Sequence, residues 1–568
     1  MSTPKKFQRT LVTSALPYAN GEIHLGHLAG AYLPADIFVR FLRMQGRDVL
    51  YICGSDEYGV PITLTAEKEG ISPKELVDRN YASIKKSFEG FGMSFDNFSQ
   101  TSREIHTETS QSFFMDLHDQ GLLKQKTTEQ FFSPSQNRFL ADRYIEGTCP
   151  KCDTAGARGD QCEKCGSSLD PTELIDPHNV LDNSPLELRE TTHWFLPLAE
   201  WQPRLEKYSA DHPEWKENVR NYCGSWFKDT LADRAATRDL GWGVPVPLPD
   251  HEGKVFYVWF EAPIGYISST REWAADQGDP EAWRKWWQDP DTRLVHFIGK
   301  DNIFFHALMF PAMLMAHTED YIVADNVPAN EFLNLEGQKL STSRNFAVWL
   351  PEYLEKFSAD PLRYTLARNL PETRDMNFTW EGFLARNNNE LGNNFGNLIN
   401  RVFTFIHKYF EGRVPEWSEA MMTDLDRQAL ADVQADLEKY SAHMEKFEIK
   451  AAMEACFHAG QAGNRYFDES APFKTRKTDL VRCGHSLGVI VQILRMLCLM
   501  LAPVVPFGME KVWSWLGAET SLWQGGWDEG VKDIPAGRQL GKQEILFPRF
   551  EEEQIQAEID RLKGLLAE

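Results

Sequence analysis

The sequence predicts an α/β protein in which a doubly wound parallel sheet is split by an insertion and followed by an all-α bundle. Two short apolar runs, 11–14 and 49–54, stand on either side of a helical stretch, and this strand–helix–strand order is typical of parallel sheets. Two Cys-x-x-Cys pairs within 149–165 then interrupt the pattern. After Trp380 the sequence is helical throughout, which indicates a separate bundle.

The composition is that of a globular protein with an acidic surface. The 568 residues are enough for about three or four domains. Lys plus Arg number 60 and Asp plus Glu 83, and the net charge of −23 argues against broad binding to nucleic acids such as DNA, though not against a local basic groove for one structured RNA. The polar N-terminus meets the first strand within about ten residues, so we expect no signal peptide and a cytoplasmic protein.

The most apolar run, 487–507, has two interpretations. It could span a membrane, or it could be a buried helix of the bundle that ends at Pro503. Gln492 and Arg495 interrupt the run, and polar groups are costly inside a bilayer. We therefore predict the buried helix and no membrane partner.

The stretch 10–30 predicts a phosphate-binding turn. An apolar strand is followed by a loop that Pro17 begins, and a helix starts near residue 23. His24 and His27 are three apart, so they share a face of its first turn, and Gly26 between them lets a ligand approach the backbone. Free N–H groups at a helix N-terminus suit phosphate, and two imidazoles there can donate hydrogen bonds to phosphoryl oxygens.

Further candidate ligand contacts follow later strands. Asp56 comes directly after the run 49–54, where ligands of open α/β sheets bind, and its carboxylate suits a cationic group; the alternative is a carboxylate that caps a loop. The sheet is expected to resume at 254–260. An apolar pocket suited to a flexible thioether would be lined by Trp259, Ala262, Pro263 and Tyr266, with Ala15, Leu16 and Tyr18 from the first loop, unless these residues are ordinary core.

The four clustered cysteines predict a metal site. Each of the pairs Cys149/Cys152 and Cys162/Cys165 can place two thiolates on one ion, and four thiolates complete a tetrahedron. Because no coordination position stays open, we expect one structural Zn²⁺. A redox dithiol pair or an iron–sulfur cluster are the alternatives. The other five cysteines are scattered, so a disulfide framework is not indicated.

The motif His-Leu-Gly-His at 24–27 resembles the first signature motif of class I aminoacyl-tRNA synthetases, and the preceding run 15–21 resembles methionyl-tRNA synthetases in particular. The resemblance implies a Rossmann-type catalytic domain, split by a connective peptide with a zinc knuckle. It also implies a ligase that joins methionine to its tRNA with ATP and Mg²⁺, in which Asp56 holds the α-ammonium group of methionine.

Two later segments extend this resemblance. At 300–306, it implies that Lys300 contacts phosphate, Asp301 a ribose hydroxyl and His306 the methionine side. Asn302 and Phe310 stand where many bacterial members have isoleucine and tryptophan.

The segment 337–344 resembles the second motif, whose usual form is Lys-Met-Ser-Lys-Ser. Lys339 keeps the first lysine, but Thr342 replaces the second. We hypothesise that Arg344 or Lys339 supplies the missing charge as pyrophosphate leaves. The implied catalytic residues are then His24, His27, Lys339 and Arg344, and the implied ATP contacts are His24, Gly26, His27, Lys300, Asp301, Lys339 and Thr342.

The helical tail resembles an anticodon-binding domain. Asn397 and Arg401 lie four apart on one helix face, and single-stranded bases are read by such amide and guanidinium groups. Phe473 stands where an aromatic ring would stack on a base. The alternative is a polar helix surface for Asn397 and Arg401 and a Pro-Phe helix start for Phe473. The tail ends in a charged helix, 551–566, where longer relatives continue into a dimerising domain, so we expect a monomer.

These observations divide the chain into five expected segments and leave two other functions open. Another class I synthetase, for cysteine or an aliphatic amino acid, would lack the pocket loops described above. A catalytically lapsed RNA-binding protein has only Thr342 in its favour. The segments are 1–120, the first half of the catalytic domain; 121–232, the connective insertion; 233–330, the second half; 331–386, a stem-contact region; and 387–568, the anticodon-binding domain.

Overall fold

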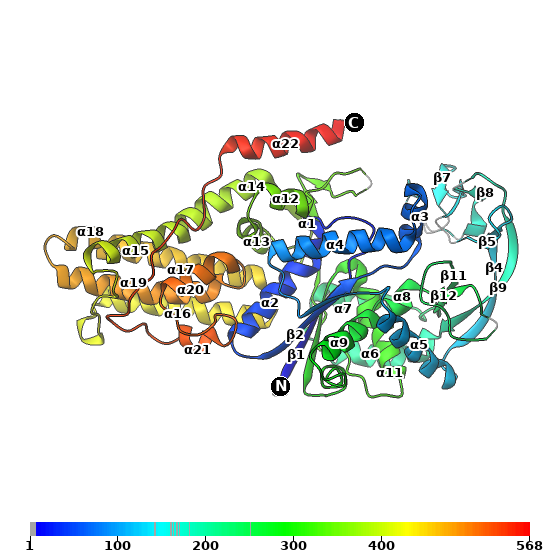
Figure 1. Cartoon of the computed structure of the whole chain (residues 1–568), viewed down its shortest axis with the longest axis horizontal. Coiled ribbons are helices and arrows are strands. Elements are labelled where there is room, and N and C mark those ends of the chain that lie inside the picture. Colours follow the sequence, from blue (N-terminus) through cyan, green and yellow to red (C-terminus); the bar gives the residue numbers. More distant parts are fainter. Residues whose placement is uncertain are drawn as a thin grey trace.

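The computed structural model describes residues 7–140, 144–158, 162, 164–165, 169, 171–180, 182–249, 251–342 and 344–567. Ser343 of the second motif therefore lies outside the described residues. The molecule is elongated, with a helical half at one end, a sheet-containing half in the middle and the insertion at the far end (Figure 1).

A five-stranded parallel sheet forms the centre of the catalytic half. The first strand of the chain lies in the middle of the sheet, and later strands are added on both of its sides, as in doubly wound folds. Because strands are added on both sides of this first strand, the chain connections on its two sides run in opposite directions. The carboxyl ends of the neighbouring strands therefore surround one crevice. In spatial order the strands are β14 (Ala329–Asn330), β13 (Thr292–Gly299), β1 (Arg9–Ser14), β2 (Asp48–Ser55) and β3 (Asn97–Gln100).

The helix after β1 begins as the sequence predicts. His24 is the N-cap of α1 (Leu25–His27), which continues through a π-helical turn, η1 (Leu28–Tyr32), into α2 (Leu33–Met44). Nearly every residue of α2 is buried, because the helix lies between the sheet and the helical half. A helix buried on all sides fixes the position of its N-terminus, where the two histidines are.

The run 254–260 does not continue the parallel sheet, so this prediction is wrong. β12 (Lys254–Phe256) pairs antiparallel with β11 (Thr237–Asp239), and Trp259 lies on the short helix α8 (Val258–Glu261). The apolar residues of this run are buried against neighbouring helices rather than between strands, which periodicity alone cannot distinguish. The parallel sheet resumes at β13.

The insertion contains a four-stranded antiparallel sheet. Its central strands are β4 (Lys124–Ser133) and β9 (Glu187–Leu196), and its edge strands are β5 (Arg138–Phe139) and β10 (Arg234–Ala235). A smaller antiparallel sheet carries the cysteines. It consists of β7 (Ala155–Arg158), β6 (Ile145–Thr148) and β8 (Ile175–Asn179). The insertion returns to the catalytic half through α6 (Leu198–Ala210) and α7 (Glu217–Trp226).

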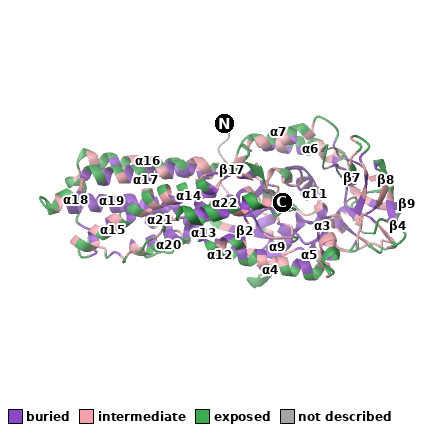
Figure 2. Ribbon diagram, turned by 90° about the horizontal axis from the view of Figure 1, so that it is seen from above, coloured by how far each residue is buried: buried purple, intermediate pink, exposed green. Residues whose placement is uncertain are grey.

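The helical half is a bundle around one apolar helix. Only α19 (Leu480–Leu501), among the described residues, is long and apolar enough to span a membrane, and it lies wholly inside the protein. The prediction of a buried bundle helix ending near Pro503 is confirmed. Its two longest neighbours are α16 (Asp424–Glu445) and α17 (Ile449–Ser470), and exposed residues line their outer sides (Figure 2). Around α19 are α15 (Asn397–Tyr409), α16 (Asp424–Glu445), α17 (Ile449–Ser470), α18 (Pro472–Thr475) and α20 (Pro506–Trp515).

The two halves meet at a buried arginine. Arg363, on α13 (Ala359–Ala367), donates to Asp36 Oδ2 of α2 at 2.5 Å and to the carbonyl oxygens of Pro503 and Val504 at 3.0 and 2.8 Å. Its side chain is fully buried, so the charge is matched by Asp36 and by backbone dipoles. The junction therefore connects the sheet-containing half directly to the bundle.

A small sheet and a last helix complete the fold. β15 (Leu333–Leu335) pairs with β16 (Gln338–Lys339) on one side and with β17 (Met376–Phe378) on the other. β15 and β16 form a hairpin, and the second motif begins on it. The C-terminal helix α22 (Glu552–Ala567) returns from the bundle, where Arg561 donates to the carbonyl oxygen of Ala347 at 3.3 Å. The last helix thus contacts the segment that follows the second motif.

Candidate active site

One cavity of about 750 Å³ opens at the carboxyl ends of the central strands. The first loop, the N-terminus of α1, the α8 turn, the end of β13 and the second-motif hairpin all contribute to its wall. Of the residues predicted to contact ATP or methionine, Lys300 does not line it, and neither does Arg344, which was predicted as catalytic. The predicted residues in the wall are Ala15, Leu16, Tyr18, His24, Gly26, His27, Asp56, Trp259, Ala262, Pro263, Tyr266, Asp301, His306, Lys339 and Thr342.

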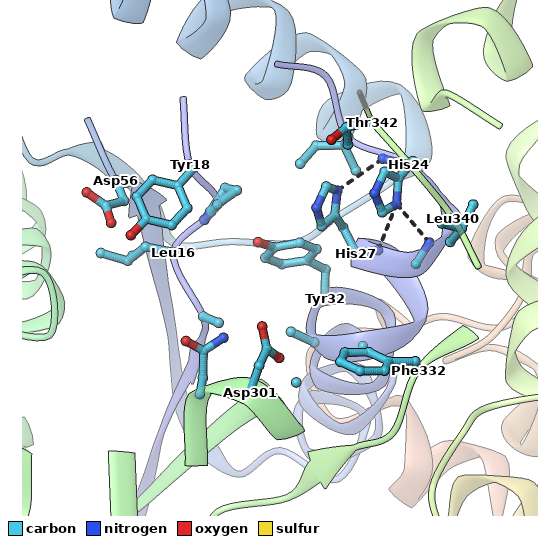
Figure 3. A pocket seen from close by; sticks show the side chains of 18 of the residues that line it. Leu16, Tyr18, His24, His27, Tyr32, Asp56, Asp301, Phe332, Leu340 and Thr342 are labelled. Carbon is cyan, nitrogen blue, oxygen red and sulfur yellow. Dashed lines mark hydrogen bonds between the residues drawn. The ribbon is translucent and has the colours of Figure 1, made fainter. Parts of the chain in front are cut away.

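The two histidines present defined hydrogen-bond donors. Nδ1 of His24 accepts from the backbone N–H of Gly26 at 3.1 Å, and Nδ1 of His27 accepts from the N–H of His24 at 3.2 Å. Because each Nδ1 is an acceptor, the proton of each neutral ring is on Nε2. The rings stack with centroids 3.7 Å apart (Figure 3). Both rings thus offer an Nε2–H donor from one helix end.

Burial keeps both imidazoles uncharged. It lowers the pKa of His24 from 6.5 to about 4. Burial also lowers the pKa of His27 well below its usual value, and a charge on His24 would lower it further. Two stacked imidazolium rings would repel each other in a low-dielectric site. At neutral pH the pair can therefore donate hydrogen bonds but adds no positive charge.

Asp56 and Tyr18 lie across the cavity from the histidines (Figure 3). The backbone N–H of Asp56 donates to the carbonyl oxygen of Pro17 at 2.8 Å, which ties the second strand end to the first loop. Burial raises the pKa of Asp56, and the nearby carboxyl groups of Glu261 and Glu57 raise it further. A cationic ligand group would stabilise the ionised carboxylate of Asp56, so the site favours an ammonium group.

Aromatic rings form the wall next to Asp56. Trp259 stacks on Phe305 with centroids 3.8 Å apart, and Tyr18 meets the edge of Trp259. The hydroxyl of Tyr266 is 2.8 Å from Nε2 of His306, whose Nδ1 is 3.0 Å from the carbonyl oxygen of residue 302. The wall is thus apolar with one fixed polar pair. Asn302 lines the cavity, whereas Phe310 is fully buried behind Tyr266.

The second-motif hairpin closes on the first motif. A Cβ atom at Gly26 would lie only 2.7 Å from Cδ1 of Leu340, so the two segments approach closely at this glycine. Lys339 and Thr342 face the cavity, and Figure 3 shows Thr342 next to His24. Arg344 is exposed, with Nε 3.3 Å from Oγ of Ser341.

Lys300 is held away from the cavity by two carboxylates. Its Nζ is 2.7 Å from Oε2 of Glu331 and 2.9 Å from Oδ1 of Asp375. Together these hydrogen bonds and charges raise the pKa of Lys300 although partial burial opposes the shift. To reach a phosphate, the lysine would have to leave both partners.

Several residues of the cavity wall were not predicted from the sequence. Among them are Tyr32, Glu331, Phe332 and Trp349. Glu331 and Phe332 directly follow a strand of the parallel sheet, and the rule that ligands bind at strand ends could have found them. Trp349, whose ring centroid is 5.6 Å from that of His24, carries no local signal because only the tertiary fold brings it there.

The four predicted cysteines converge on one point. The Sγ atoms of Cys149, Cys152, Cys162 and Cys165 all lie within 4.8 Å of one another. Two of the distances are 3.9 and 3.7 Å, close to the sulfur–sulfur edge of about 3.8 Å that a tetrahedral Zn–thiolate site requires. The cluster can therefore hold one metal ion.

The three predicted anticodon residues lie at the outer part of the bundle. Asn397 is exposed on α15. Arg401 on the same helix pairs with Asp468 at 2.8 Å and covers the ring of Phe467 on α17. Phe473, in the neighbouring α18, is 38% exposed. Their roles in reading an anticodon stay predictions.

Comparisons with known proteins agree with this geometry. The family of tRNA synthetases class I (M) matches residues 10–403, and the anticodon binding domain of methionyl tRNA ligase matches 414–566. The methionine–tRNA ligase of Bacteroides fragilis strain YCH46 is 50% identical over 565 residues, covering 98% of this chain and 81% of that protein. That of Salinibacter ruber is 49% identical over 596 residues, covering 100% and 83%.

A solved structure is similar over nearly the whole chain. Mycobacterium tuberculosis methionyl-tRNA synthetase in complex with methionyl-adenylate superposes with a TM-score of 0.79 at 26% identity, covering 95% of this chain and 100% of that one. The family match extends over both halves of the molecule. The chain therefore belongs to the methionine–tRNA ligase family of class I tRNA synthetases.

Proposed function

We propose that this protein activates L-methionine with ATP, releases pyrophosphate, and transfers the methionyl group to the 3′ end of its tRNA. The observation that carries the proposal is the single cavity in which both signature segments meet an apolar wall and a buried carboxylate. The family shown by the comparisons supports the same reaction.

In the first step a carboxylate oxygen of methionine bonds to the α-phosphorus of ATP, and the bond from that phosphorus to pyrophosphate breaks. The Nε2–H groups of His24 and His27 would donate to the phosphoryl oxygens on which negative charge develops. Lys339, on strand β16 of the hairpin, would supply positive charge in the same cavity. In the second step a ribose hydroxyl of the tRNA attacks the acyl carbon, and AMP leaves.

Recognition of methionine is assigned to the other side of the cavity. Asp56 would receive the α-ammonium group, and the thioether would lie among Trp259, Tyr266 and the first loop. Aromatic–sulfur contacts and burial of apolar area favour this side chain over shorter ones. His306 and Tyr266 hold each other in place on this wall.

Mg²⁺ is expected to enter with the triphosphate. The acidic side chains of the wall are Glu22, Asp56, Asp301 and Glu331, whereas the only basic one with a full charge is Lys339. Such a wall suits a nucleotide whose phosphate charge is reduced by a divalent cation. Asp301 would contact the ribose, as the resemblance implies.

The ion of the insertion is proposed to be Zn²⁺ in a structural role. Four thiolates and the sulfur–sulfur distances match its tetrahedral preference, and all four positions are used by protein. Cys149, Cys152, Cys162 and Cys165 would thus hold the turns between the strands of the small sheet.

The bundle is proposed to read the anticodon through Asn397, Arg401 and Phe473. The match of residues 414–566 to an anticodon binding domain supports this role for the bundle and includes Phe473, while Asn397 and Arg401 precede the matched range. The five-segment division stays part of the proposal. β4 begins at Lys124, just inside the proposed start of the insertion, whereas β10 (Arg234–Ala235) pairs with β9 of the insertion and lies just beyond its proposed end. We also propose that the protein acts as a cytoplasmic monomer that binds neither DNA nor membranes.

Amino-acid-dependent ATP–pyrophosphate exchange tests the function. Methionine should stimulate exchange, while cysteine, valine and leucine at the same concentration should not. Stimulation by one of these three would indicate another class I synthetase. Binding of tRNA without any exchange would indicate a lapsed enzyme, for which the substitution at Thr342 is the one argument.

The replacement for the second lysine needs its own test. Arg344 is exposed two residues after Thr342, so its guanidinium is free to swing toward the cavity. We expect Arg344→Ala to lower the rate of adenylate formation at least about tenfold, the effect of losing one charge contact. Single-turnover kinetics measure this rate, and an unchanged rate would leave Lys339 as the only cation of the hairpin.

A further inference from the structure

A buried histidine–glutamate pair lies behind the methionine side of the cavity. Nε2 of His106, on α5 (Glu104–Asp119), is 2.7 Å from Oε2 of Glu261, the last residue of α8. Both side chains are fully buried. Neither residue lines the cavity, and neither belongs to the predicted site.

The hydrogen bonds of His106 show that one proton lies between the two side chains. Nδ1 of His106 is 3.0 Å from Oγ of Ser268, whose own hydroxyl donates to the carbonyl oxygen of Gly265 at 3.1 Å. Since that hydroxyl gives its one hydrogen to Gly265, Nδ1 is assigned as the donor to Oγ. Nε2 of the neutral ring is then an acceptor, with Oγ of Ser110 at 3.2 Å as a second neighbour. The shorter contact to Glu261 requires a proton between nitrogen and oxygen.

The proton is better placed on Glu261 than on His106. Oε1 of Glu261 is buried and has no hydrogen-bond partner. An unpartnered carbonyl oxygen of a neutral acid costs much less than an unpartnered oxygen of a buried carboxylate. Burial acts in the same direction on both groups, since it lowers the pKa of His106 to about 3 and raises that of Glu261.

The neighbouring glutamate shows the opposite arrangement. Glu57 is also buried, but Ser55 and Gln100 donate to its Oε1 at 2.7 and 3.0 Å, and Ser102 donates to its Oε2. Such a donor set satisfies an ionised carboxylate. Among the described residues, Glu261 has only His106 as a hydrogen-bond partner of its side chain.

The pair supports the part of the wall that would contact the amino acid. On α8, Glu261 comes two residues after Trp259, and Ala262 follows it directly. Trp259 and Ala262 both line the cavity. A Cβ atom at Gly265 would lie 2.9 Å from Cδ1 of Leu16 and 3.9 Å from Cε1 of His106. Gly265 thus lies between His106 and Leu16, and Leu16 is part of the cavity wall.

We propose that Glu261 is a positioning residue for the amino-acid side of the cavity: it remains a neutral carboxylic acid, donates its proton to His106, and so holds the Trp259 turn without placing a second negative charge behind Asp56. The inference rests on the proposed function, in which Asp56 receives an ammonium group. An ionised Glu261 would oppose the ionisation of Asp56, because like charges in a buried site disfavour each other.

Two substitutions of similar volume separate the hydrogen bond from the charge. In Glu261→Gln the amide N–H can still donate to Nε2 of His106, and no ionisable group remains. In Glu261→Met the donor is lost. We expect the KM for methionine in ATP–pyrophosphate exchange to stay within about threefold of wild type in Glu261→Gln and to rise at least about tenfold in Glu261→Met. The KM for ATP should stay within about threefold in both.

A reciprocal pair of variants keeps the test independent of folding defects at residue 261. His106→Gln retains an acceptor for the proton of Glu261, whereas His106→Leu does not, so the first should bind methionine more tightly. Titration calorimetry with methionine and the intact chain measures this, and thermal unfolding verifies that each variant is folded.

Two results would overturn the inference. If Glu261→Gln is impaired as much as Glu261→Met, an ionised carboxylate is required and the neutral acid is wrong. If Glu261→Met keeps the wild-type KM for methionine, the pair has no positioning role. Absence of methionine-dependent exchange in the wild-type protein would instead contradict the proposed function, so the two failures can be told apart.

Discussion

At the scale of single residues, the site depends on which nitrogen carries a proton. His24 and His27 use Nδ1 to accept backbone N–H groups, so the helix terminus itself selects the tautomer that points an N–H into the cavity. Their uncharged state follows from burial and mutual stacking. The positive charge that phosphate chemistry needs must therefore come from the hairpin and from the cation that accompanies ATP.

We expect His27→Ala to reduce the rate of methionyl-adenylate formation by about 10²–10³-fold, the usual effect of removing one preorganised donor to a developing oxyanion. The affinity for methionine should change less than about twofold, because Asp56 and the aromatic wall are on the other side of the cavity. Single-turnover kinetics and calorimetry measure the two quantities. His458→Ala, on the exposed surface of α17, is the matched control.

At the scale of secondary-structure elements, the contact between α1 and the second-motif hairpin brings the two signature segments together. The N–H of Leu25 also donates to the carbonyl oxygen of Val348, and that of Leu350 to Ile23, so the chain after the hairpin runs beside the helix start. Both motifs are short and polar, and neither would hold its position alone. The backbone pairing supplies the fixed distance between them.

Gly26→Ala should disturb this contact. The added methyl group would meet Cδ1 of Leu340 at 2.7 Å and Cε1 of His24 at 3.0 Å, so the Leu340 side chain must move and the His24 ring is also crowded. We expect kcat/KM for ATP to fall about tenfold or more, since small misplacements of catalytic groups are costly. Leu340→Ala in the same chain should restore part of the loss by making room. An unrestored double variant would place the strain at His24 instead.

Metal removal should affect the insertion before the catalytic half. Cys149 and Cys162 contribute to a small separate core with Phe131, Tyr144 and Leu174, and that core is too small to be stable on its own. We expect one zinc ion per chain by elemental analysis and its loss in Cys162→Ala. Hydrogen exchange should then increase across 145–179, with protection of β1 and β2 retained. A chain without zinc but with normal protection of this region would contradict the structural role.

At the scale of the whole molecule, the junction between the two halves contains buried charges. Asp36 is matched by Arg40 and Arg363, and these partners lower its pKa to about 2 against the opposing effect of burial. Asp360 is different. Its Oδ2 accepts the N–H of Gly508 at 2.7 Å, but Oδ1 has no partner, and burial raises its pKa to about 6. The junction thus contains one well-paired carboxylate and one poorly paired carboxyl group.

Asp360 should make stability fall as the pH rises. Because its pKa is higher in the folded than in the unfolded state, the folded state binds more protons between about pH 4 and pH 6. Its stabilising proton is lost through this window, at a cost of up to about 3 kcal/mol by pH 7. Asp360→Asn has no ionisable group at this position and lacks this pH-dependent contribution to the free energy of unfolding. Its thermal stability relative to wild type should therefore improve from pH 5 to pH 7.5.

The comparison between the two proteins is essential for that measurement. Buried histidines such as His24, His106 and His306 have lowered pKa values, so they destabilise the folded state as the pH falls below about 6.5. Their contribution has the opposite sign and is common to both proteins. A difference in stability that does not vary with pH would show that Asp360 does not titrate in the junction.

Local patterns in the sequence determined much of this protein. The first strand, the helix that starts at His24, the four thiolates and the buried helix α19 were all predictable, because each depends on residues that are neighbours in the chain or on one face of one helix. Nearly half of the residues that line the cavity were also predicted as site residues, from the two signature motifs and from loops after strands. The family resemblance, rather than periodicity, supplied their assignment to ATP and methionine.

Only the tertiary structure decided the contacts between distant parts of the chain. It placed Trp349 against His24, held Lys300 on Glu331 and Asp375, and moved the run 254–260 from a predicted parallel strand to a hairpin strand and a short helix. It also placed the neutral pair of His106 and Glu261 behind the wall. The partners of these residues, and hence their protonation and direction, are set by which surfaces pack together, and no local pattern carries that information.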